Sequence, residues 1–122
     1  MIDQASLLWN VKSEISNIFL SYTCLGFGNS NQSSQPNQSP LLGDDKIYKQ
    51  AETSYEEENG FVSITWASPL IYGDLWNSTV GEIAVVKNCT SGRDDGLLRI
   101  TLNPPISLNQ SDIFKFYITV RL

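Results

Sequence analysis

The clearest hydrophobic pattern in the chain lies in residues 112–122. Apolar side chains occupy every second position there, and mostly polar side chains stand between them. The apolar set is Phe114, Phe116, Ile118, Val120 and Leu122. A period of two is that of a β-strand with one buried face. The segment therefore predicts one long strand, pinned in a sheet up to residue 122.

A different period marks residues 3–20, where apolar residues recur at spacings of three, four and seven. They are Leu7, Leu8, Val11, Ile15, Ile18 and Phe19. This spacing places them on one face of a helix, which Asp3 could cap through its carboxylate. Because the polar face has almost no Lys or Arg, we expect the helix to cover a sheet and not to lie on a membrane.

The middle of the chain predicts a β-hairpin. Residues 46–55 alternate loosely, residues 61–66 alternate cleanly, and Asn59-Gly60 stands between them. Asn-Gly supplies the positive φ angles that a tight hairpin turn requires, so the two segments are expected to pair antiparallel. We interpret the glutamates at 56–58 as a solvated, mutually repelling turn.

Two more strands are expected after residue 80. Residues 81–87 are apolar on both faces, as in a central strand, and residues 97–102 alternate. Pro104 and Pro105 cannot donate hydrogen bonds to a ladder, so the second strand is expected to end before residue 103. Residues 69–79 are expected to form a loop.

These elements together predict one domain over residues 1–122, which is long enough to bury a single core. The expected fold is mainly β: an antiparallel β-sandwich, jelly-roll-like, with one N-terminal α-helix at about residues 3–20 and strands within residues 46–122. Residues 29–40 consist almost wholly of Asn, Gln, Ser and Pro. Such a segment cannot bury enough apolar area to offset its ordering entropy, so it is expected to be a loop that is mobile or ordered by a partner.

Charge and hydropathy argue against two classes of partner, nucleic acids and membranes. The net charge is −5, and the eight Lys and Arg residues are scattered, so nucleic acid is not an expected partner. No apolar run approaches the ~20 residues that span a bilayer, and the start Met1-Ile2-Asp3-Gln4 lacks the basic residues of a signal peptide. We therefore expect the chain to fold in a cytosol, without a membrane partner.

The two cysteines, Cys24 and Cys89, are far apart and form no C-x-x-C pair, which argues against a zinc site or a thioredoxin-type motif. We expect two reduced, half-buried thiols. One disulfide is the alternative.

The residues offer little catalytic chemistry. Histidine is absent, which removes the commonest general base and metal ligand. A carboxylate pair of the glycosidase type, with Glu82 or Asp74, is the arrangement still allowed. The rings of Trp66, Trp76 and Tyr72 could stack on a sugar, although aromatic residues in strands favour a core or a subunit interface. We expect no enzyme, no cofactor and no metal.

Four segments carry a resemblance to a known family. They are Tyr22-Thr23-Cys24-Leu25-Gly26-Phe27-Gly28, then Leu42-Gly43-Asp44-Asp45-Lys46, then Val80-Gly81-Glu82-Ile83-Ala84-Val85, and finally residues 97–122 with Pro105-Ile106. In this order, after a helix, they resemble the N-terminal domain of phage tail-collar and tail-fibre proteins. Ala84 departs from the family's glycine, and Asp44-Asp45 replaces its glutamate. Because the predicted strand runs to Leu122, we expect a domain without the family's fibre shaft.

The resemblance implies a structural protein of a tailed-phage virion, acting as a tail-fibre adaptor, collar or baseplate subunit. It also implies homo-oligomers, often trimers, that assemble with other virion proteins. A capsid decoration protein is the alternative in the same class, and a carbohydrate-binding module is the alternative from another. Our interface candidates are Tyr72, Trp76, Asn29, Gln32, Gln35 and Trp66.

Overall fold

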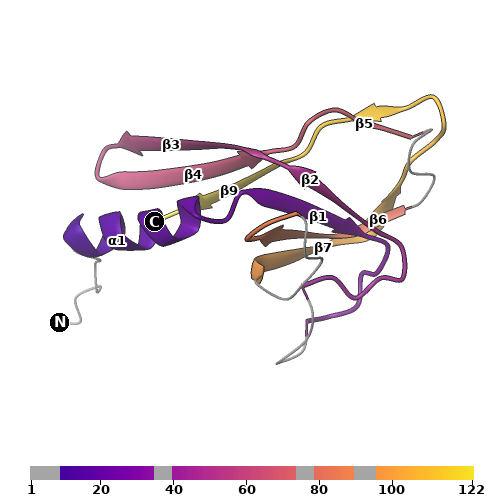
Figure 1. The fold of residues 1–122 in the computed structure, drawn as a ribbon, viewed down its shortest axis with the longest axis horizontal. Coiled ribbons are helices and arrows are strands. Elements are labelled where there is room, and N and C mark those ends of the chain that lie inside the picture. Colours follow the sequence, from indigo (N-terminus) through magenta and orange to yellow (C-terminus); the bar gives the residue numbers. More distant parts are fainter. Residues whose placement is uncertain (1–8, 35–39, 74–78, 90–95) are drawn as a thin grey trace.

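The computed structural model describes residues 9–34, 40–73, 79–89 and 96–122. Within them it contains one helix, α1 (Trp9–Leu20), and nine strands that pair antiparallel (Figure 1). The four-stranded sheet has the order β2-β1-β6-β7, with bounds β2 (Lys46–Gln50), β1 (Cys24–Gly28), β6 (Thr79–Val86) and β7 (Gly96–Ser107). The three-stranded sheet has the order β3-β4-β9, with bounds β3 (Glu52–Glu58), β4 (Phe61–Ala67) and β9 (Tyr117–Arg121). A short ribbon pairs β5 (Ile71–Tyr72) with β8 (Ile113–Phe114). The prediction of a mainly β fold with antiparallel sheets and one helix is confirmed.

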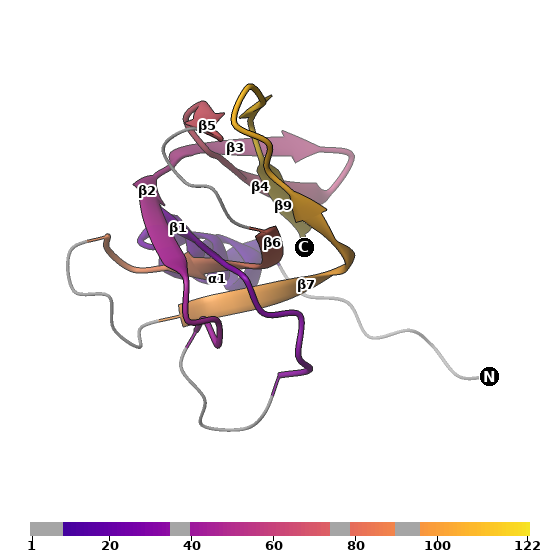
Figure 2. The same cartoon turned by 90° about the vertical axis from the view of Figure 1, so that its right-hand side faces the viewer.

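The main hydrophobic core draws side chains from both larger sheets. Figure 2 shows the strands of these two sheets on different sides of the molecule. Its buried members are Leu25, Phe27, Ala51, Val62, Ile64, Trp66, Ile71, Val80, Ile83, Val85, Leu108 and Ile118. Helix α1 covers β4, and the ring centroid of Phe19 lies 6.4 Å from that of Trp66. The helix therefore covers a sheet, as predicted, but Val11 and Ile18 of its predicted apolar face are 37% and 57% exposed. Residues 3–8 of the predicted helix lie outside the described residues.

A second, smaller cluster lies on the opposite face of the four-stranded sheet. It contains Cys24, Leu41, Ala84 and Val86. Strand β6 lies between β1 and β7 and contributes to both clusters. This arrangement confirms the central strand predicted from residues that are apolar on both faces.

The Asn-Gly turn is confirmed, but the strand before it is β3 at Glu52–Glu58, so the prediction that the glutamates at 56–58 form a turn is wrong. Asn59 and Gly60 have φ angles of 51° and 79°, and β3 pairs with β4 across them. Residues 46–55, however, divide at Ala51, whose N–H donates to the carbonyl of Thr23 at 2.9 Å. Strand β2 belongs to the four-stranded sheet and β3 belongs to the three-stranded sheet. The segment alternates only loosely because the chain passes from one sheet to the other within it.

The prediction that Pro104 and Pro105 end a strand is wrong, since β7 continues to Ser107. Strand β7 is the edge of its sheet, so one of its sides needs no backbone partner. The prolines also fall in a register shift between the pairs Val80↔Ile106 and Glu82↔Thr101, where the ladder is interrupted. Because of the edge position and the register shift, the strand needs no N–H donor at the two prolines.

The C-terminal run keeps its predicted alternation but forms two strands, β8 and β9. Its even-numbered residues are partly or fully buried, and its odd-numbered residues are exposed. Between the strands, the N–H of Phe116 donates to Oγ of Ser68 at 2.9 Å and its carbonyl accepts the N–H of Ser68 at 2.8 Å. A serine side chain thus replaces one ladder contact. Leu122 and Val62 exchange two backbone hydrogen bonds, which confirms the pinned end.

Within the part of the chain that the structure describes, no helix has both the length and the apolar character needed to cross a bilayer.

Candidate functional site

Glu82 is a carboxylate in β6 that is 0% exposed, and backbone amides surround it. Its Oε1 accepts the N–H of Leu42 at 2.8 Å, and its Oε2 accepts the N–H of Gly43 at 2.7 Å and that of Ser30 at 3.3 Å. A buried charge needs such donors because water no longer solvates it. Glu82 therefore joins β6 to two loop segments, one on each side of residues 35–39.

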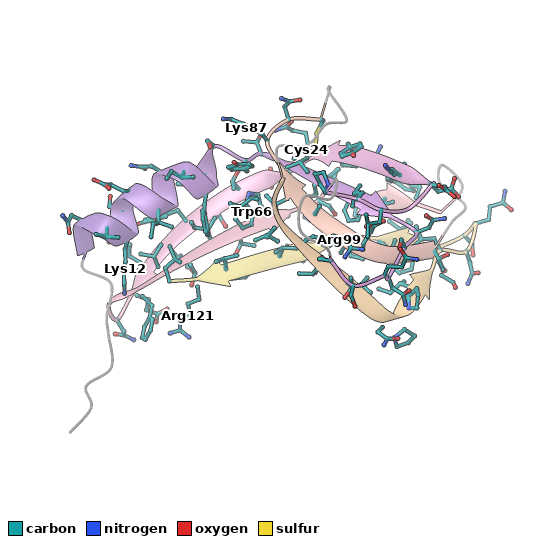
Figure 3. The ribbon with its side chains drawn as sticks, turned by 90° about the horizontal axis from the view of Figure 1, so that it is seen from below. Lys12, Cys24, Trp66, Lys87, Arg99 and Arg121 are labelled. Carbon is teal, nitrogen blue, oxygen red and sulfur yellow. A yellow bond between two sulfur atoms is a disulfide. The ribbon has the colours of Figure 1, made fainter. Side chains whose placement is uncertain are left out.

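Arg99, on the neighbouring strand β7, forms an ion pair with Glu82. Its Nε donates to Oε1 at 2.9 Å, and the two side chains are 6% and 0% exposed. Its Nη1 donates to the carbonyl of Gln32 at 2.8 Å and to Oγ of Ser34 at 2.9 Å. Nη2 is buried without a hydrogen-bond partner among the described residues. Figure 3 shows Arg99 within the half of the molecule that holds the four-stranded sheet.

Two glycines leave the space that the Glu82 carboxylate occupies. A Cβ on Gly28 would collide with Oε2 of Glu82, and a Cβ on Gly43 would lie 2.9 Å from the same atom. The second glycine of the Gly-x-Gly pattern in β1 thus makes room for the buried Glu82 side chain, whereas a Cβ on the first, Gly26, would meet Leu41 and Tyr48. The four segments that carry the resemblance, at 22–28, 42–46, 80–85 and from 97 onward, meet at this ion pair.

Glu82, which the residue inventory still allowed as a glycosidase carboxylate, is not positioned for that role. Its carboxylate is sealed from solvent, and both oxygens already accept hydrogen bonds from the protein. A glycosidase acid must reach the glycosidic oxygen of a bound sugar, and this carboxylate cannot do so. Asp74, the other residue considered, lies outside the described residues.

The first half of the polar segment 29–40 forms hydrogen bonds with other parts of the chain. Asn29 is half-buried, its backbone N–H donates to the carbonyl of Asp45 at 3.2 Å, and its Oδ1 accepts the N–H of Asp45 at 3.3 Å. Gln32 has an exposed side chain, but its carbonyl accepts from Arg99. Asp45 and Arg99 thus form hydrogen bonds with residues 29, 32 and 34, and the expectation of a mobile or partner-ordered loop stays a prediction. Gln35 lies outside the described residues.

Trp66 is not available as an interface or as a sugar platform. It is 0% exposed, and its Nε1 donates to the carbonyl of Tyr22 at 2.6 Å (Figure 3). Its indole fills the core beneath α1, the structural role that aromatic residues of strands commonly take. Trp76 lies outside the described residues, and Tyr72 remains as an exposed ring.

Tyr72 lies in an exposed apolar ribbon that the sequence reasoning recognised in part. Tyr72 is 41% exposed, and its partner across the β5–β8 ladder, Ile113, is 57% exposed. Leu70 and Tyr117, at the base of the ribbon, are 52% and 63% exposed. Ile113 and Tyr117 occupy the polar phase of the alternation in residues 112–122. Large side chains in that phase were the signal that could have identified this surface.

The three-stranded sheet continues this exposed surface on the side away from the core. We call this side its outer face. It consists of Glu52, Ser54, Glu56 and Glu58 on β3, Phe61, Ser63, Thr65 and Ala67 on β4, and Tyr117, Thr119 and Arg121 on β9. The guanidinium carbon of Arg121 lies 4.0 Å from the ring centroid of Phe61, and Nζ of Lys12 lies 5.7 Å from it. Figure 3 shows Lys12 and Arg121 at the same end of the molecule.

The cysteines form a disulfide, so the expectation of two free thiols is wrong. Cys24 begins β1 and Cys89 follows β6, and their Cα atoms lie 5.5 Å apart. The reason is topological: β1 and β6 are neighbouring strands, with Cys24 opposite Val86. A sequence separation of 65 residues carries no sign of this proximity.

Tyr55 has a pKa above its ordinary value. Its hydroxyl donates to Oε1 of Glu57 at 2.5 Å, and this hydrogen bond is the main cause of the rise, with desolvation and the negative charge of Glu57 adding to it. Glu57→Gln is expected to lower the pKa of Tyr55 toward 10.0, measured by near-ultraviolet absorbance titration with Tyr55→Phe as the reference. A raised folded pKa stabilises the fold below the unfolded pKa, and this contribution disappears as pH rises above about 10 through the folded pKa. Superimposable titrations of wild type and Glu57→Gln would show that Glu57 is not the cause.

Comparisons of the chain with protein-family models, with curated proteins and with solved structures found no match.

Proposed function

We propose that this protein is a structural subunit of a tailed-phage virion, which joins fibres to the tail or builds the collar or baseplate, and that it works by assembly and not by catalysis. The observation that carries the assembly role is the exposed ribbon in which Tyr72 and Ile113 lie side by side. Neighbouring exposed apolar and aromatic side chains are typical of protein interaction sites. The adjoining Leu70 and Tyr117 enlarge this surface.

The phage assignment is supported by the resemblance of four segments, and the Glu82–Arg99 pair gives those segments a shared physical role. A buried, fully hydrogen-bonded carboxylate fixes loop positions relative to the sheet. A subunit that holds other proteins in fixed relative positions needs loops that are themselves fixed. We also propose that the two larger sheets form a jelly-roll-like sandwich, since side chains of both contribute to one core.

The test is the protein composition of virions from cells that carry the gene. In a phage that lacks the gene and is complemented by a plasmid copy, wild-type protein is expected in gradient-purified particles at a copy number that follows the tail proteins. The double variant Tyr72→Ser, Ile113→Ser is expected to leave particles without the protein or without fibres, as measured by mass spectrometry and electron microscopy.

Ile18→Ser provides a matched control, because Ile18 and Ile113 are both 57% exposed but Ile18 lies on α1. It is expected to assemble like the wild type. Protein that is absent from particles would overturn the virion assignment. A copy number that follows the capsid lattice would replace the tail role with that of a decoration protein.

A further inference from the structure

We propose that the outer face of the three-stranded sheet binds the same face of a second copy of this chain, about a two-fold axis parallel to the strands. The inference deepens the assembly role proposed above and rests on it, since it names one partner in the assembly. It follows from how the charges of this face are distributed over its strands.

The outer face has an acidic edge of three glutamates and, at the opposite edge, one basic residue, Arg121, which we call its basic edge. Strand β3 places Glu52, Glu56 and Glu58 on this face, and β9 places Arg121 on it. Strand β4 separates the two edges, so they are about 10 Å apart within one copy. Among the residues that the structure describes, the salt bridge is that between Arg99 and Glu82, on the other sheet. Arg121 and the three glutamates therefore form no salt bridge with one another within the described part of one copy, and their opposite charges can pair across two copies.

The charge distribution selects the symmetry of a pair. A two-fold axis parallel to the strands places β3 of each copy over β9 of the other, so the acidic edge faces the basic edge on both sides. A two-fold axis perpendicular to the strands and in the plane between the sheets would place β3 over β3, with glutamates facing glutamates. Like charges across an interface oppose association. The first arrangement is isologous and closes at two copies.

The strand register identifies the contact within this pair. Glu56 lies opposite Ser63 on β4, and Ser63 lies opposite Arg121 on β9. The three residues form one row across the sheet, so rotation about the axis brings Glu56 of each copy over Arg121 of the other. The contact occurs twice.

Apolar area on the same face supplies the remainder of the interface. Phe61 is 45% exposed and Tyr117 is 63% exposed, and the half-buried Thr65 and Ala67 lie on β4 beyond Phe61, with Ala67 opposite Tyr117. Phe61 already stacks under Arg121, which holds that guanidinium over the face. Aromatic and Arg side chains are the groups enriched in protein interfaces.

Charge reversal tests the proposal. Glu56→Arg and Arg121→Glu are each expected to raise the dimer dissociation constant at least about tenfold, because each substitution acts twice in an isologous interface. The double variant, in which the charges are exchanged, is expected to recover most of the affinity. Sedimentation equilibrium measures the constants, and higher salt is expected to weaken the wild-type dimer. Circular dichroism confirms that each variant is folded.

Glu57→Arg is the matched control, since Glu57 lies on the same strand but faces away from the outer face, beside Tyr55. It is expected to leave the constant unchanged. A wild-type monomer, a trimer, or a dimer that is indifferent to both reversals would overturn the proposal. A monomer that is still found in tails would overturn the pairing and leave the virion role in place. A charge-dependent dimer that is absent from virions would support the pairing and overturn the virion role.

Discussion

Glu82→Gln is expected to lower the free energy of unfolding by about 3–5 kcal/mol, the range for breaking one side of a buried ion pair. The substitution keeps the shape of the side chain but leaves the guanidinium of Arg99 without its counter-charge at 6% exposure. It also places an amide NH₂ or a neutral oxygen where Leu42 and Gly43 donate their N–H groups. Urea denaturation followed by tryptophan fluorescence measures the loss.

Two further variants separate the ion pair from a general surface effect. Glu58→Gln removes an exposed carboxylate from β3 and is expected to change stability by no more than about 0.5 kcal/mol. Adding Arg99→Met to Glu82→Gln is expected to be less harmful than the sum of the single changes, because no buried charge remains unpaired. Hydrogen exchange of the Leu42 and Gly43 amides should accelerate in Glu82→Gln. A loss below about 1 kcal/mol would mean that the pair does not hold the loop.

The parts of the fold that sequence predicted are those set by local periodicity. Alternation in residues 112–122 assigned the correct face to every side chain of β9, because a strand repeats every two residues whatever it packs against. Asn59-Gly60 identified its hairpin for a similarly local reason, the positive φ angles. These signals need no knowledge of distant contacts.

The parts that sequence missed depend on contacts between distant segments. Nothing near Gly28 indicates that a glutamate 54 positions later lies against it, yet that contact explains the glycine. Likewise, Pro104 is compatible with β7 only because β7 is an edge strand with a register shift at that point. Trp66 was named as an interface candidate because periodicity gives alternating faces and does not say which of them is buried in the core.

The Cys24–Cys89 disulfide likewise joins distant segments, so the sequence did not predict it. Its removal is expected to cause the second large loss of stability. Reduction is expected to lower the free energy of unfolding by about 4 kcal/mol, the chain-entropy value for a loop closed across 65 residues. The closed loop contains β1 through β6, so the reduced unfolded chain regains freedom over more than half of its length. Urea denaturation with and without dithiothreitol measures the difference.

Cys89→Ala isolates the cross-link from other effects of the reductant. Cys89 is half-buried, whereas Cys24 is 0% exposed, so truncation at position 89 disturbs less packing. The variant is expected to match the reduced wild type and to be indifferent to dithiothreitol. Its remaining thiol, at Cys24, should react slowly in the folded state because Leu41 and Val86 pack around it. Two reactive thiols in the wild type, unfolded without a reductant, would show that the bridge does not form. In that case only packing would stabilise the second cluster, and reduction would not lower the free energy of unfolding by about 4 kcal/mol.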